Sequence, residues 1–106
     1  MADIFDTAIA QIFTKLGSAA TFTPATGPAV PGIYVNLELE SAVQGMDAGV
    51  VRIMPTIEYI ISDIGREAVE GETFSITDTE SPAYGNTYTI CERVAYDGRT
   101  ATVAVK

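Results

Sequence analysis

The sequence predicts a mainly β fold of the α+β class, a small antiparallel β-barrel or β-sandwich with an N-terminal helix and a short second helical turn. Apolar residues recur at helical spacing only over residues 3–16. Over residues 19–105 they recur at every second position instead, which is typical of strands. The dipeptide Asp97-Gly98 separates two such alternating runs, a strong signal for a β-hairpin. Five or six strands closing on themselves would bury all their inward faces.

Residues 3–16 are the one clearly predicted helix. Acidic Asp3 and Asp6 lie where the helix dipole favours negative charge, and Lys15 lies at the opposite end. Gly17 is a natural helix terminator. The apolar stripe of this helix comprises Ile4 or Phe5, Ala8, Ile9, Ile12, Phe13 and Leu16. The stripe either packs on the sheet or docks on another protein chain, and the sequence leaves both possibilities open.

Three strands are expected next. A short one around Ala20 and Phe22 is followed by the Pro/Gly-rich loop 24–31. The second strand covers residues 33–40, and the third covers residues 51–61 with Pro55 near its middle. Proline cannot donate to a β-ladder, which places Pro55 at a sheet edge or a bulge. The inward residues of the two long strands are predicted to be Ile33, Val35, Leu37, Leu39, Val51, Ile53, Ile57, Tyr59 and Ile61.

Residues 41–49, between the two long strands, are predicted to be an irregular loop. They are mostly small residues without a strand or helix pattern. Val43 and Met46 have no evident local core to enter. The loop is therefore either a flexible connection or a contact for a partner.

The rest of the chain is predicted to hold a helical turn and three strands. Ser62-Asp63 is expected to cap a short helical turn through residues 66–69, and a strand follows over residues 72–77. A two-residue turn at Asp97-Gly98 would then pair Tyr96 with Arg99. The face buried by this hairpin would comprise Tyr88, Ile90, Val94, Ala101, Val103 and Val105, with Ile90 opposite Val105.

One acidic residue interrupts that apolar face. Glu92 either lies near a sheet end, or a bulge turns it outward. Over the whole fold, the residues predicted to be among the most buried are Leu37, Ile57, Phe74, Ile90 and Val103.

Length and composition indicate one folded domain over residues 1–106. With 47% apolar residues the chain should fold, and no apolar run approaches the roughly 20 residues that span a bilayer. The N-terminus has no signal-peptide pattern, so we expect no secretion by that route and no membrane partner. A net charge of −8 with six scattered bases argues against direct nucleic-acid binding.

The composition leaves carboxylate-only catalysis as the remaining option for an enzyme. The chain has no histidine, which removes the commonest general base and metal ligand. Its one cysteine, Cys91, excludes an internal disulfide and is interpreted as a small sheet residue. Three pairs of acids have i,i+2 spacing, so on a strand each pair would share one face: Glu38 with Glu40, Glu70 with Glu72, and Asp78 with Glu80. Glu38 and Glu40 alternate with Leu37 and Leu39, which is typical of a solvated face. We expect no enzyme activity, no metal and no cofactor.

Short motifs along the chain match one protein family. They are Met1-Ala-Asp3 and Phe5-Asp6-x-Ala8-Ile9-Ala10, then Asp63 after a β run, a charged turn and Gly71-Glu-Thr-x-x-Ile76, and finally Arg93-Val94 before Asp97-Gly98. In these motifs and in the order of its predicted elements, the chain resembles the head–tail joining (neck or head-completion) proteins of lambda-like tailed phages and prophages. The loop 24–31 and residues 81–85 have no clear counterpart in that family.

The resemblance implies a non-enzymatic structural protein of the virion, present in the host cytoplasm during assembly. It would form a ring at the neck and can be a monomer in isolation. Its partners would be the portal or head-completion ring on one side and the tail tube or tail terminator on the other. The candidate interface residues are Ile4, Phe5, Asp6, Ile9, Ile12, Ala42, Val43, Gln44, Met46 and Asp47.

Two alternatives stay open because a small β fold does not determine function. One is a tail terminator or another minor tail or virion component. The other, of a different class, is a small-ligand or carbohydrate-binding module. Its stacking surface would come from tyrosines, although the chain has no Trp and most of the tyrosines alternate with core positions. They are Tyr34, Tyr59, Tyr84, Tyr88 and Tyr96.

Overall fold

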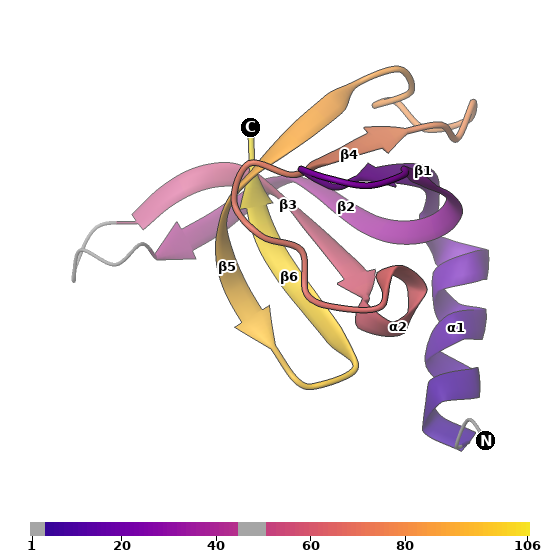
Figure 1. Ribbon diagram of the computed structural model, residues 1–106. Helices are drawn as coiled ribbons and strands as arrows, with labels where there is room; N and C mark the ends of the chain where they lie inside the picture. The colour runs from indigo at the N-terminus through magenta and orange to yellow at the C-terminus, as the bar shows by residue number, and fades with distance from the viewer. Residues whose placement is uncertain (1–3, 45–50) are drawn as a thin grey trace.

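Six antiparallel strands close into a barrel in the order β1-β2-β3-β6-β5-β4 (Figure 1). The computed structural model describes residues 4–44 and 51–106. The strands are β1 (Ser18–Thr23), β2 (Val30–Gln44), β3 (Val51–Ile60), β4 (Thr73–Ile76), β5 (Thr87–Tyr96) and β6 (Thr100–Val105). Helix α1 (Ile4–Leu16) runs beside the barrel, and the short helix α2 (Ile61–Ile64) follows β3. The predicted mainly β barrel with an N-terminal helix is confirmed.

Aromatic and aliphatic side chains from all six strands fill the barrel. The ring of Phe74 is fully buried, with its centroid 5.2 Å from that of Phe22 and 5.4 Å from that of Tyr59. Four of the five residues predicted to be most buried are buried, and Leu37 is half-buried. No helix within the described ranges is long and apolar enough to cross a membrane.

The turn between β5 and β6 is longer than the sequence predicts. Tyr96 pairs with Ala101 rather than with Arg99, so four residues separate the paired positions. The Oδ1 atom of Asp97 accepts hydrogen bonds from the backbone N–H groups of Arg99 at 2.9 Å and Thr100 at 2.8 Å. The two-residue turn was the wrong prediction because the aspartate side chain closes a wider loop.

Two bulges in β5 bring the hairpin back to the predicted register. The pairing shifts between Ile90 and Glu92, and again between Arg93 and Ala95. Each shift places one extra residue in β5. Ile90 therefore pairs with Val105 as predicted, although the turn is two residues longer.

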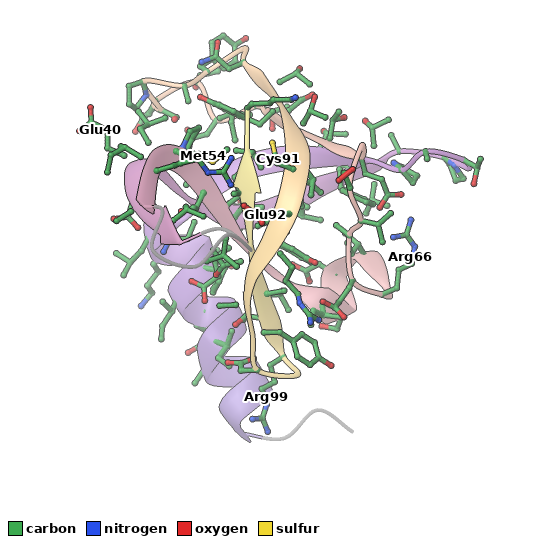
Figure 2. The ribbon with its side chains drawn as sticks, turned by 90° about the vertical axis from the view of Figure 1, so that its left-hand side faces the viewer. Glu40, Met54, Arg66, Cys91, Glu92 and Arg99 are labelled. Atoms are coloured by element: carbon green, nitrogen blue, oxygen red, sulfur yellow. The ribbon has the colours of Figure 1, made fainter. Side chains whose placement is uncertain are left out.

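The bulges also decide which β5 side chains face the core. Val94 is the extra residue of one bulge and is 42% exposed, so its predicted place on the buried face is wrong. The bulges flank Glu92, whose Oε1 atom lies 2.6 Å from Nη2 of Arg52 on β3 (Figure 2). Of the two alternatives for Glu92, a place near a sheet end or a bulge that turns it outward, the structure shows the bulge.

Beyond the barrel, β2 and β3 continue as a two-stranded arm, defined here by residues 39–44 and 51–55 (Figure 1). Within it Ser41 pairs with Met54 and Ala42 with Ile53. Residues 41–44 therefore belong to β2, and the prediction of an irregular loop is wrong for them. The rest of that predicted loop, with Met46 and Asp47, lies outside the described residues.

A bulge at the base of the arm explains why the sequence pattern misled. The β2–β3 register shifts between Glu38 and Ser41, so the side-chain alternation is interrupted there. Leu39, predicted to face inward, lies within this interruption and is 47% exposed, whereas Val43, beyond it, is buried. Ile53 was also predicted to face inward and is 68% exposed.

Pro55 lies opposite this bulge. Its neighbour Thr56 is the first β3 residue to pair with β6, so among the described strands only β2 borders Pro55. The missing N–H therefore costs no β6 hydrogen bond, and the predicted edge or bulge position is confirmed.

Helix α2 is shorter than expected and begins without the predicted cap. Its N-cap residue is Ile60, no side chain caps it, and the chain leaves the helix at Gly65, which has φ of +83°. The predicted cap by Ser62-Asp63 and the helical turn over residues 66–69 are therefore wrong. Side-chain hydrogen bonds, rather than a helix, hold the segment that follows.

Glu72 is the buried carboxylate that organises that segment. It is 2% exposed and accepts two hydrogen bonds from Arg66, Nη1 to Oε1 at 2.9 Å and Nη2 to Oε2 at 2.6 Å. The backbone N–H groups of Val69 and Ala25 donate to it at 2.8 and 3.0 Å. Mainly through Arg66, and against the effect of burial, the pKa of Glu72 falls to about 2. Because Glu70 is exposed and Glu72 is buried, these two acids do not share a face, contrary to what their spacing predicts.

Candidate partner-binding surface

Helix α1 is fastened to the barrel at its C-terminal end. Phe13 is buried, and its backbone oxygen accepts a hydrogen bond from the N–H of Gly17 at 2.8 Å. A Cβ atom at Gly17 would lie 2.5 Å from that oxygen and 2.7 Å from the backbone oxygen of Val35. Glycine is therefore required where the helix passes close to β2, while the N-terminal end of α1 points away from the barrel (Figure 1).

Replacing Gly17 with Ala should lower the free energy of unfolding by about 1–3 kcal/mol, because two backbone oxygens would have to move apart. The neighbouring Ser18→Ala variant removes atoms without adding any and serves as the control. Urea unfolding followed by circular dichroism would measure both. Equal stability of the two variants would show that α1 does not need this close approach.

The apolar stripe of α1 is divided between the barrel and solvent. Phe13 is buried and Ile9 is half-buried, whereas Ile12 is 54% exposed and Leu16 is 80% exposed. One part of the stripe therefore packs on the barrel, as the first interpretation expects, and another part is open to a partner chain, as the second expects. The candidate residues Ile4, Phe5 and Asp6 lie at the start of α1, and their side chains are outside the described set.

A groove of about 720 Å³ lies between α1, α2 and the β5–β6 turn; we call it the α1–α2 groove. Figure 2 places Arg99 at the tip of the β5–β6 hairpin, beside α1. Partial burial raises the pKa of Asp63, on one side of the groove. The backbone N–H groups of Thr100 and Arg99 lower the pKa of Asp97, on another side. The groove is lined by Ile9, Ile60, Ile61, Ser62, Asp63, Gly65, Asp97, Gly98 and Arg99.

The sequence did not indicate this groove. Ile9 was a candidate interface residue, but the other walls come from α2 and the β5–β6 turn, far away along the chain. The only sequence signals near it were the Asp63 motif and the Asp97-Gly98 turn, both of which were interpreted as structural.

The arm carries the second group of candidate residues. Ala42 is exposed and Val43 is buried, so Val43 is not available to a partner in this structure. Gln44 is the last residue of β2. Sequence reasoning assigned Leu39 and Ile53 to the core, but among the described side chains of the arm they are the large apolar ones exposed to solvent.

Much of the positive charge is neutralised within the molecule. Ion pairs join Arg52 to Glu92, Arg66 to Glu72 and Arg93 to Glu67 in the described part of the chain. Glu38 and Glu40 are exposed on β2, as predicted for a solvated face. With a net charge of −8, the accessible surface is therefore mainly acidic.

The tyrosines do not form a common stacking surface. Tyr59 is buried, and its hydroxyl accepts a hydrogen bond from the N–H of Ala68 at 2.8 Å. Tyr34 and Tyr96 border two separate hollows. Within residues 4–44 and 51–106, no group of three or more side chains is arranged to hold a metal ion.

Comparison with models of known protein families gives no match, and comparison with curated proteins gives no significant match.

Proposed function

We propose that the protein is a non-enzymatic structural component of a phage virion that joins the DNA-filled head, at its portal or connector, to the tail. The observation that carries the proposal is a closed barrel with two separate apolar projections. These are the exposed side of α1 and the arm, which lie at opposite sides of the barrel in Figure 1.

A joining protein that works as a ring must contact several chains at once, namely the head, the tail and neighbouring copies of itself. Ile12 and Leu16 on α1 belong to one projection, and Leu39 and Ile53 on the arm belong to the other. Large apolar side chains grouped on projections are typical of protein–protein contacts. The closed barrel between them gives a rigid spacer, because most of its strand edges are paired.

The sequence motifs support the same assignment. The Gly71-Glu-Thr-x-x-Ile76 motif supplies the buried Glu72 and strand β4, and Asp97-Gly98 supplies the β5–β6 turn. The motifs that carry the resemblance are thus structural positions, as expected where a family shares a fold and an assembly role rather than a catalytic site.

A phage or prophage lacking this gene should accumulate filled heads and free tails, which purified protein should join into infectious particles. Ile12→Asp and Ile53→Glu should each lower the yield at least about tenfold, because a lost apolar contact of about 1.5–3 kcal/mol changes binding by that factor or more. Both positions are exposed, so the variants should stay folded.

The matched control is Tyr84→Asp, which changes an exposed aromatic residue outside α1 and the arm. It should retain full joining activity. Normal particles in the absence of the gene would contradict the proposed function. Normal joining by both the α1 and the arm variants would show that neither projection is a contact.

A further inference from the structure

The exposed side of α1 is an apolar ridge that carries one positive charge. Ile12, Lys15 and Leu16 are all exposed and follow i, i+3, i+4 spacing, so they share one side of the helix. We call this set the α1 ridge. Leu16, at 80% exposure, is the most exposed of the large apolar residues described. An apolar ridge of this kind fits a groove with an apolar floor and an acidic rim.

The α1–α2 groove has that complementary chemistry. Its apolar lining residues Ile9, Ile60 and Ile61 are half-buried. Asp63 lies on its rim and makes no ion pair with any described residue. Arg99, on the same rim, already has an interaction of its own. The groove volume of about 720 Å³ is large enough to accept several side chains.

We propose that the α1 ridge of one copy of this chain docks in the α1–α2 groove of the next copy. Ile12 and Leu16 would contact the apolar floor, and the ammonium group of Lys15 would pair with the carboxylate of Asp63. Acidic groups outnumber basic ones in this chain, and the ridge joins an accessible cation to exposed apolar residues, which makes it complementary to a groove with an acidic rim.

The proposed contact joins two different surfaces, so it is heterologous. Such contacts repeat from copy to copy and close into a ring when the rotation between copies allows it. The inference deepens the proposed function, because it supplies the contact between neighbouring subunits of a neck ring. The net charge of −8 on every copy opposes association, so the contact should form mainly at high local concentration.

Cysteine trapping with purified protein tests the contact directly. In a Cys91→Ser background, one protein carries Leu16→Cys in the ridge and another carries Ser62→Cys in the groove. When mixed and oxidised, they should form a heterodimer in about tenfold excess over a mixture of Ser62→Cys with Tyr84→Cys. A protein with both ridge and groove cysteines should form a ladder of larger oligomers.

A charge exchange tests the ion pair within the same assay. Lys15→Glu in the ridge protein should reduce trapping, and Asp63→Lys in the groove protein should restore it. Circular dichroism would confirm that each variant is folded. Heterodimer yield no higher than the Tyr84 control would overturn the proposed contact, and failure of the charge exchange to restore trapping would overturn the Lys15–Asp63 pair.

These measurements need no phage particles, so they can be separated from the test of the proposed function. An oligomer ladder together with normal virions in the absence of the gene would contradict the joining role alone. Loss of joining without any trapped heterodimer would contradict the subunit contact alone.

Discussion

Replacing Glu72 with Gln should lower the free energy of unfolding by about 2–4 kcal/mol. The carboxylate is 2% exposed and accepts hydrogen bonds from Arg66, Val69 and Ala25. A glutamine has the same shape, but its NH₂ group is a donor and would face at least one of these N–H groups. The substitution also removes the negative charge opposite Arg66. The variant would lose at least one of these part-buried hydrogen bonds at a side chain that is itself buried, which is a large cost. Urea unfolding at neutral pH would measure the loss.

The neighbouring Glu70→Gln variant is the matched control, because it makes the same chemical change at an exposed position. Its stability should stay within about 0.5 kcal/mol of the parent protein. If the two variants were equally stable, the hydrogen bonds of Glu72 would contribute nothing net to folding.

The same carboxylate should make the protein sensitive to acid. Its pKa is about 2 in the folded protein, against 4.5 as its ordinary value. The unfolded chain therefore takes up this proton at higher pH than the folded one does, so stability falls as the pH falls. The contribution of Glu72 is complete above about pH 4.5 and is lost between there and pH 2. The stability difference between the parent and Glu72→Gln should narrow over that interval, and a constant difference would contradict the assignment.

Replacing Phe74 with Ala should cost about 3–5 kcal/mol, because the ring is fully buried and its removal leaves a cavity. The rings of Phe22 and Tyr59 both pack against it, so the loss would reach β1 and β3 as well as β4. For comparison, Leu39→Ala should change stability by no more than about 0.5 kcal/mol, since Leu39 is exposed on the arm. Denaturant unfolding of the two variants under the same conditions provides the test. Similar losses at the two positions would mean that the barrel interior does not dominate stability.

Strand positions could be predicted because alternation is a local property. The β1 strand around Ala20 and Phe22, the long β2 and β3 strands and the β5–β6 hairpin all follow from it. The side that a residue faces could not be predicted beyond a bulge. One extra residue interrupts the alternation, and at these interruptions Leu39 and Val94 lie at the surface instead of in the interior.

The buried Glu72 could not be recognised from sequence for a different reason. Acidic residues at i,i+2 spacing are usually solvated, and only the folded chain shows the donors that satisfy this one. Ala25 is 47 residues away along the chain. Arg66 and Val69 reach Glu72 because the segment after α2 is not helical, contrary to prediction.

The candidate surface was partly predictable. Helical spacing identified Ile9 and Ile12 on α1, and the structure leaves Ile12 exposed. Leu16 was assigned to the same stripe, but only the structure shows that the barrel leaves it uncovered. The α1–α2 groove requires α1, α2 and the β5–β6 turn to be near one another, and no local pattern carries that information.

Strand β6 closes the barrel by pairing with β3 on one side and β5 on the other. It is also the final strand of the barrel to leave the ribosome, since it follows the other five in the sequence. A nascent chain therefore exposes the edges of β3 and β5, together with the apolar interior, until β6 has been synthesised. Open edges and exposed cores are the features that cause aggregation during synthesis. Complete folding of the barrel must consequently follow translation of β6, and molecules truncated before it should be recovered as aggregates or degraded chains.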